Sequence, residues 1–216
     1  MTTILLIRHA TNDYVKSGRL AGWTPGVHLN EEGQAQARAL GLRLASMPLR
    51  AIYSSPLERT QETAQAIAEH HPALSVIVRE DIGEVQYGDW TGLRISELTM
   101  RKMWKVIQEY PSRAYFPNGE AMRDAQNRMV NAIEAIVQAH PGQMVALVSH
   151  ADLIKMATAH YMGLHLDNFQ RIIISPASIT TLELGHSRPF VASVNDLAHL
   201  YDAEKQAKKE SSHGTP

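Results

Sequence analysis

Five side chains with the chemistry to act on a phosphate group lie far apart in the sequence, each at an expected strand end, helix start or loop. They are Arg8, His9, Arg59, Glu84 and His150. Phosphoryl transfer needs donors for three equatorial oxygens, a nucleophile in line with the leaving group, and an acid for the departing oxygen. Two imidazoles, two guanidiniums and one carboxyl can fill these roles, so the set predicts phosphoryl transfer without a metal.

Each of the two histidines follows a short apolar run, at 4–7 for His9 and at 144–148 for His150. Such runs are typical of strands buried on both faces, and α/β enzymes keep their sites at the carboxyl ends of such strands. An imidazole attacks phosphorus only through an unprotonated nitrogen, so we expect its other nitrogen to donate to a carbonyl of the following loop. The guanidinium forks of Arg8 and Arg59 match phosphate oxygens, which makes them the expected phosphate clamp.

Glu84 lies in a loop that carries glycines at Gly83, Gly88 and Gly92. The same loop holds Tyr87 and Trp90, whose rings can remove water from the carboxyl and favour its protonated form. A protonated Glu84 is therefore the expected acid for the leaving oxygen.

The elements that must position these residues alternate along the chain. Apolar runs predict strands at 4–7, 51–53, 74–78, 144–148, 179–184 and 190–194, the last two antiparallel. Helical periodicity predicts helices at 35–47, 95–109, 119–139 and from 150 to 161, and one that runs to 67 with Ser55 as its cap and Pro56 at its first position. The pattern predicts an α/β fold, a three-layer sandwich with a mixed, mostly parallel central sheet and helices on both faces.

Composition sets further limits on the chain. Its 216 residues are 44% hydrophobic, which favours one domain, expected at 1–201 with helical cap elements at about 95–140 and a disordered tail at 202–216. The formal net charge of -1 argues against nucleic acid or an anionic membrane as partner. Cysteine is absent, which excludes disulfides, thiolate nucleophiles and cysteine metal sites. Without a signal-like N-terminus or an apolar stretch of about 20 residues, a cytoplasmic location is expected.

Four blocks of sequence resemble the histidine phosphatase superfamily, which includes the cofactor-dependent phosphoglycerate mutases. The resemblance covers residues 4 to about 195, and its blocks are Leu-Ile-Arg-His-Ala-Thr, Tyr-Ser-Ser-Pro-Leu-Glu-Arg-Thr-Gln-Glu-Thr-Ala, Glu84 with Gly-Asp-Trp-Thr-Gly, and Val-Ser-His. It implies a phosphoglycerate mutase-like fold, His9 as the nucleophile that becomes phosphohistidine, and Glu84 as acid and then base. It also implies that Arg8, Arg59 and His150 form the phosphate pocket.

The resemblance also suggests substrate-binding positions. It assigns backbone groups at Ala21 and Gly22 to the substrate. The chain departs from the family pattern at Ala10, Val15 and Ala151-Asp152. Ala151 is retained as a substrate-binding position. Val15 stands where the family often has an asparagine, and the side-chain amide of Asn12 is expected to replace the one that is missing there.

Three functions remain open at this point. The first is a metal-independent phosphatase that hydrolyses a small-molecule phosphomonoester. The second is a phosphomutase, for which Arg94, Arg101, Lys102 and Arg113 are the candidate extra cations, although the family's basic insertion with paired arginines is missing. The third is a catalytically weak protein that binds phosphorylated ligands, which the retained reactive side chains argue against.

No motif for a nucleotide cofactor or a zinc helix occurs, and the other histidines lack metal-ligand spacing. We therefore expect neither a cofactor nor a metal. The expected partner is a small phosphorylated substrate, and a homodimer is kept open as the assembly.

Overall fold

A central sheet runs through the part of the chain that the structure describes. The structure is a computed structural model that describes residues 1–185 and 188–201. The expected tail at 202–216 lies outside the described residues, as does part of the expected turn at 185–189. The strands of the sheet are β1 (Thr2–Arg8), β2 (Leu49–Ser54), β3 (Val76–Val78), β4 (Met144–Ser149), β5 (Ile179–Leu184) and β6 (Phe190–Asp196).

The sheet is mixed and mostly parallel, as the sequence predicted. Its order is β3-β2-β4-β1-β5-β6. The pairings β1 with β4, β2 with β4 and β2 with β3 are parallel, whereas β5 runs antiparallel to both β1 and β6. Because β1 and β4 are parallel neighbours with Arg8 opposite Ser149, their carboxyl ends lie at the same edge of the sheet.

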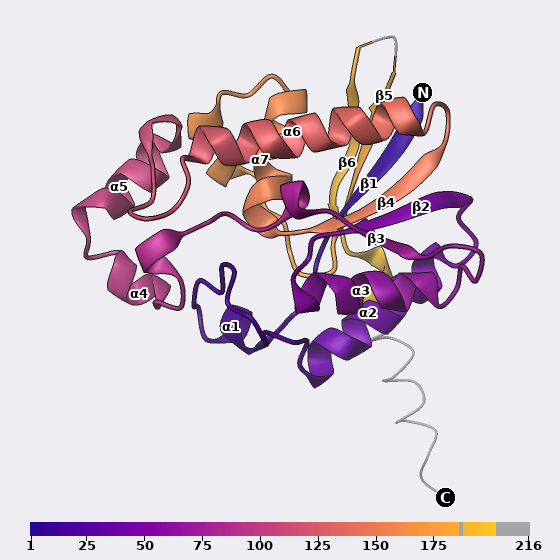
Figure 1. The fold of residues 1–216 in the computed structure, drawn as a ribbon, viewed down its shortest axis with the longest axis horizontal. Helices are drawn as coiled ribbons and strands as arrows, with labels where there is room; N and C mark the ends of the chain where they lie inside the picture. The colour runs from indigo at the N-terminus through magenta and orange to yellow at the C-terminus, as the bar shows by residue number, and fades with distance from the viewer. Residues whose placement is uncertain (186–187, 202–216) are drawn as a thin grey trace, which may run out of the picture.

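Helices cover both faces of this sheet. They are α1 (Asp13–Lys16), α2 (Glu31–Leu44), α3 (Glu58–Ala68), α4 (Ile95–Leu98), α5 (Lys102–Glu109), α6 (Met122–Ala139) and α7 (Ala151–Tyr161), with short 3-10 turns at Glu80–Ile82, Gly88–Trp90, Pro111–Arg113 and Leu166–Arg171. Helices α2 and α3 lie on one face and α6 and α7 on the other (Figure 1). The three-layer α/β sandwich is thereby confirmed.

Alternating side chains of β1 show why both faces are covered. Successive strand residues point to opposite faces, so Leu5 and Ile7 join one core cluster and Ile4 and Leu6 the other. All four are at most 2% exposed. At roughly 25 cal/mol per Å2 of buried apolar surface, each such side chain contributes about 1.5–3 kcal/mol to folding. A strand stabilised on both faces is a rigid support for the polar residues that follow it.

Two predicted helices differ from the observed ones. The helix expected at 95–109 is broken into α4 and α5, and Met100 between them is 87% exposed. The helix expected to begin at Ser55 begins at Glu58, with Leu57 in the capping position and no side-chain cap. Ser55 is used elsewhere, since its hydroxyl is hydrogen bonded to a buried histidine.

The loop near α1 pairs with the segment that leads into α4. Leu20 N donates to Leu93 O at 3.0 Å and Ile95 N donates to Gly18 O at 2.8 Å. Helices α4 and α5 project beside this loop, away from the sheet (Figure 1). The domain limits and the role of these helices as a cap stay predictions. Over the described residues, no helix is long and apolar enough to span a membrane.

Candidate active site

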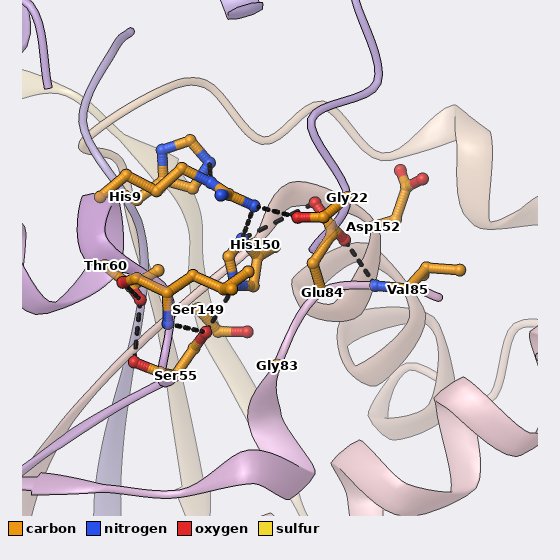
Figure 2. A network of polar contacts seen from close by, with 12 residues as sticks. His9, Gly22, Ser55, Thr60, Gly83, Glu84, Val85, Ser149, His150 and Asp152 are labelled. Carbon is orange, nitrogen blue, oxygen red and sulfur yellow. Dashed lines mark hydrogen bonds and ion pairs between the residues drawn. The ribbon is translucent and has the colours of Figure 1, made fainter. Parts of the chain in front are cut away.

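The two predicted histidines meet at the carboxyl ends of β1 and β4. His9 N donates to Ser149 O at 3.0 Å, and the rings of His9 and His150 lie 5.3 Å apart between centroids at an interplanar angle of 61°. Both side chains are buried. Figure 2 shows the two histidines near each other, and Arg59 of α3 donates a hydrogen bond to each ring.

The protonation state of His9 follows from its contacts. Its Nδ1 lies 2.7 Å from Ala10 O, and because a carbonyl only accepts, Nδ1 carries the proton. This confirms the expected carbonyl acceptor in the loop after His9. Arg59 Nε donates to His9 Nε2 at 3.3 Å, which marks Nε2 as the unprotonated nitrogen, whose lone pair accepts this hydrogen bond. Burial, and then the charges of Arg59 and Arg8, hold the pKa of His9 well below its ordinary value, so the ring is neutral.

Buried donors without hydrogen-bond partners belong to residues that line the same cavity as His9. Arg59, the second residue of α3, is 1% exposed, and its Nη2 donates to Gly22 O at 2.9 Å and to His150 Nδ1 at 3.3 Å. Arg8 Nη1 donates to Ile174 O at 2.8 Å. Arg59 Nη1, Arg8 Nε and Asn12 Nδ2 are buried and have no hydrogen-bond partner among the described residues. Because buried donors are rarely left unpaired, this arrangement favours an anionic ligand with several oxygens.

His150 is fixed by Ser55. Its Nε2 lies 2.8 Å from Ser55 Oγ, and its Nδ1 accepts from Arg59, so Nε2 holds the proton. Burial, and then the charges of Arg59 and His9, lower the pKa of His150 well below its ordinary value. A bound dianion would oppose the repulsion from the arginines and favour the protonated ring. The sequence did not identify Ser55 as the support of this histidine.

Glu84 faces the same centre from the loop before the Gly88–Trp90 turn. Val85 N donates to its Oε1 at 2.9 Å, and its Oε2 lies 3.7 Å from His150 Nδ1. Burial, and then the negative charge of Asp152, raise the pKa of Glu84 from 4.5 to about 7. A carboxyl with this pKa can give and take a proton near neutral pH. The raised pKa agrees with the desolvation expected from the sequence, whereas the contribution of Asp152 was missed.

The backbone of Glu84 is held by a residue that the sequence did not suggest. Arg128 of α6 donates through Nη1 to Asp81 O at 3.0 Å and to Gly83 O at 2.7 Å, and through Nη2 to Glu84 O at 2.9 Å. Its Nη2 also donates to Glu120 Oε1 at 2.7 Å. No local sequence pattern marked Arg128, because its carbonyl acceptors lie 44 to 47 positions earlier in the chain. Arg128 thus fixes the loop that carries the carboxyl.

A cavity of about 330 Å3 opens next to these residues. Of the predicted substrate-binding residues, Asn12, Ala21 and Ala151 line the cavity. Gly22 is not among the residues that line the cavity. Its carbonyl accepts from Arg59, and its φ of 52° lies in the left-handed region that glycine tolerates. The expectation that a Gly22 amide serves the substrate stays a prediction. In the described residues, no group of three histidine, aspartate or glutamate side chains is placed to hold a metal.

Comparisons with known proteins agree with this geometry. A family model described as histidine phosphatase superfamily (branch 1) matches residues 4–197. A protein named phosphoserine phosphatase 1 from Hydrogenobacter thermophilus is 30% identical over 211 residues, which cover 97% of this chain and 99% of the relative. A protein named 2,3-bisphosphoglycerate-dependent phosphoglycerate mutase 2 from Gloeobacter violaceus is 27% identical over 88% of this chain and 84% of the relative.

Solved structures share the fold. The structure of YhfR from Bacillus stearothermophilus matches with a TM-score of 0.86 and 28% identity, and the match covers 93% of this chain and 100% of that protein. The layered α/β architecture described above is therefore that of an experimentally known group of proteins.

Proposed function

The chain belongs to the histidine phosphatase superfamily, and from this premise we propose that it is a metal-independent phosphatase that hydrolyses a small-molecule phosphomonoester through a phosphohistidine at His9. The observation that carries the proposal is the unprotonated Nε2 of His9, held only by a 3.3 Å contact from Arg59 Nε, in a cavity that is also lined by Arg8, Arg59 and Asn12 with their buried, unpaired donors. A phosphoryl group in this position meets a nucleophile and the charge-assisted hydrogen bonds that stabilise its transition state.

In the proposed first step, His9 Nε2 attacks phosphorus while the bond between phosphorus and the ester oxygen breaks. Glu84, protonated for much of the time near pH 7, gives its proton to the departing oxygen, and the alcohol leaves. The proton on His9 Nδ1 stays there and keeps its hydrogen bond to Ala10 O, which stabilises the positive charge that develops on the ring. Arg8, Arg59 and a protonated His150 hold the phosphoryl oxygens.

In the proposed second step, water attacks phosphorus on the side from which the alcohol left. The Glu84 carboxylate accepts a proton from this water, the bond between phosphorus and Nε2 breaks, and inorganic phosphate leaves. Glu84 is again protonated and His9 again neutral, so the cycle is balanced without a metal or cofactor. One carboxyl with a pKa of about 7 serves as acid and then as base.

A phosphomutase is the second candidate, favoured by the relative from Gloeobacter violaceus. A mutase must hold the dephosphorylated substrate while the phosphoryl group returns from the histidine to another oxygen of that substrate. This requires further cations around the substrate. Of the four cations that the sequence offered for this purpose, none is among the described residues that line the cavity. The cavity is lined instead by Arg19 and Lys155 in addition to Arg8 and Arg59, so the assay below decides between water and a second substrate oxygen as the acceptor.

The relatives suggest where to begin with substrates. Those from Hydrogenobacter thermophilus and Arabidopsis thaliana are named phosphoserine phosphatase and metal-independent phosphoserine phosphatase. We therefore propose O-phosphoserine as the first physiological substrate to test. The cytoplasmic location and the homodimer stay predictions.

The test is hydrolysis of p-nitrophenyl phosphate in the presence of a chelator. We expect release of phosphate by the unmodified protein and its loss in His9→Ala, whereas His160→Ala, on the exposed end of α7, serves as the matched histidine control and retains activity. A parallel incubation with 3-phosphoglycerate and a bisphosphate primer detects isomerisation. Activity that requires added metal, or that survives in His9→Ala, would count against the proposal.

A further inference from the structure

One part of the cavity wall carries a group of polar side chains that bind no reacting atom in the proposed steps. Tyr87 Oη donates to Asp152 Oδ2 at 3.0 Å. Lys155 Nζ donates to Asp152 Oδ1 at 3.4 Å and to Gln170 Oε1 at 3.0 Å. All four residues line the cavity next to the phosphate-binding donors.

Asp152 and Lys155 are mostly buried and yet retain hydrogen-bonding capacity. Their side chains are 21% and 17% exposed. A carboxylate offers about four acceptor positions, of which Asp152 uses two, and an ammonium offers three donors, of which Lys155 uses two. A ligand in the cavity can therefore gain one donor and at least one acceptor from this pair without breaking its existing contacts.

The charges of the cavity indicate which ligand fits. Arg8 and Arg59 balance the two negative charges of a phosphate monoester, while a protonated Glu84 and a neutral His9 add none. His150, protonated when the phosphate is bound, and Arg19, which also lines the cavity, add positive charge that attracts a further anionic group of the substrate. The remaining pair, Asp152 and Lys155, is neutral as a whole but presents both signs. The alcohol part of a matching substrate is likewise neutral as a whole, with one cation and one anion.

We propose that Asp152 binds the ammonium and Lys155 the carboxylate of a zwitterionic phosphomonoester, so that the enzyme prefers an O-phosphorylated amino acid to the corresponding hydroxy acid. This specificity rests on the proposed phosphatase function. Asp152 stands two residues after His150, and its charge acts on Glu84 and Arg8, so this wall lies within electrostatic reach of the phosphate site (Figure 2). A carboxylic hydroxy acid would place its anion in the same cavity without an ammonium to meet Asp152.

The test compares O-phospho-L-serine with 3-phosphoglycerate. The two esters differ by an ammonium in place of a hydroxyl on the carbon next to the carboxylate, and they share the same kind of primary alcohol as leaving group. Any effect of Asp152 on Glu84 therefore cancels in the ratio of their kcat/KM values. We expect the unmodified enzyme to prefer phosphoserine by roughly 10- to 100-fold, the range for one charge-assisted hydrogen bond.

Asp152→Asn should reduce this preference to within about threefold, while Asp124→Asn, a matched change on the exposed face of α6, should leave it unchanged. Lys155→Met should raise KM for both esters by a larger factor than KM for p-nitrophenyl phosphate, because all three compounds carry a phosphate but only the two esters carry a carboxylate. Thermal melting of each variant separates a folding defect from a binding defect, and Lys155→Met gives an independent reading if Asp152→Asn does not fold.

The outcomes separate the two proposals. Hydrolysis of p-nitrophenyl phosphate with equal use of the two esters, or an Asp152→Asn variant that keeps the preference, overturns the specificity and leaves the phosphatase proposal intact. A KM that changes by the same factor for all three compounds in Lys155→Met, or not at all, removes the role of Lys155. Absence of hydrolysis for all three compounds overturns the phosphatase proposal itself, and the specificity with it.

Discussion

Glu84→Gln tests the acid role of the loop carboxyl with little change of shape. Glutamine keeps the size of the side chain, and its Oε1 can still accept from Val85 N, as the carboxyl does at 2.9 Å. It cannot donate an acidic proton or accept one near neutral pH. The substitution therefore removes proton transfer and retains the loop contact.

The expected loss depends on the leaving group. General acid catalysis contributes about 10²- to 10⁴-fold, or about 3–5 kcal/mol, when the leaving oxygen needs a proton. For an alkyl phosphate such as O-phosphoserine, kcat/KM should therefore fall by roughly 10²- to 10⁴-fold. For p-nitrophenyl phosphate, whose leaving oxygen is stabilised by its ring, kcat/KM should fall by less than about tenfold. Because kcat/KM reports only on the steps through release of the alcohol, the base role in the second step does not obscure the comparison.

The pH dependence supplies a second readout of the same variant. With the pKa of Glu84 at about 7, kcat/KM for the alkyl ester should decline above that pH in the unmodified enzyme, and Glu84→Gln should lack this decline. The folded carboxyl keeps its proton between pH 4.5 and about 7, where the unfolded chain releases it, so its contribution to stability falls as pH rises through this range. The shift corresponds to about 3 kcal/mol of unfolding free energy, which the unmodified protein loses between pH 4.5 and pH 8 and Glu84→Gln does not. In denaturant unfolding, the stability of the variant relative to the unmodified protein should therefore be about 3 kcal/mol higher at pH 8 than at pH 4.5.

Equal losses for the two leaving groups would refute the acid role of Glu84. So would an alkaline decline that persists in Glu84→Gln, because the titrating group would then be another residue. Initial rates with both substrates across the pH range, measured on the same preparations, are sufficient to decide.

Three further predictions concern the supports of the site. Arg128→Met should lower the free energy of unfolding by about 2–4 kcal/mol in urea titrations and reduce turnover, because the Asp81 and Gly83 carbonyls lose this donor and the Glu120 carboxylate loses its ion pair; full stability would contradict this. Ala177 has a φ of 57°, and its N donates to the carbonyls of Arg8 and His9. Ala177→Gly should therefore be about 1–2 kcal/mol less destabilising than Ala157→Gly within α7, and equal melting curves would remove the strain argument. Ser55→Ala should reduce kcat/KM about tenfold with an unchanged fold, because His150 loses its partner at 2.8 Å; unchanged kinetics would show that the contact is dispensable.

Local patterns predicted much of the fold and the main part of the site. The apolar runs before His9 and His150 are strands because alternating side chains are buried on both faces, and a parallel pair delivers both rings to one edge. Arg59 lies near a helix start and Glu84 in a glycine-rich loop, as the sequence predicted.

The errors and omissions concern contacts between distant residues. Ser55 and Pro56 carry a strong local signal for a helix start, yet the Ser55 hydroxyl serves a histidine 95 residues away and the helix begins later. Arg128 reaches carbonyls 44 to 47 positions earlier, which no periodicity indicates. Asp152 was seen only as a departure from a pattern, since its contact with Tyr87 exists only in the folded chain.

The most direct test of the central claim is to trap the phosphoryl group on the enzyme. The unmodified protein is mixed with p-nitrophenyl phosphate, stopped within milliseconds in alkali, digested, and analysed by mass spectrometry for acid-labile phosphate. Phosphate on Nε2 of His9 is predicted, together with a burst of p-nitrophenol equal to the enzyme concentration if release from histidine is the slow step. Turnover without phosphate on His9, or phosphate on another residue, would contradict the account.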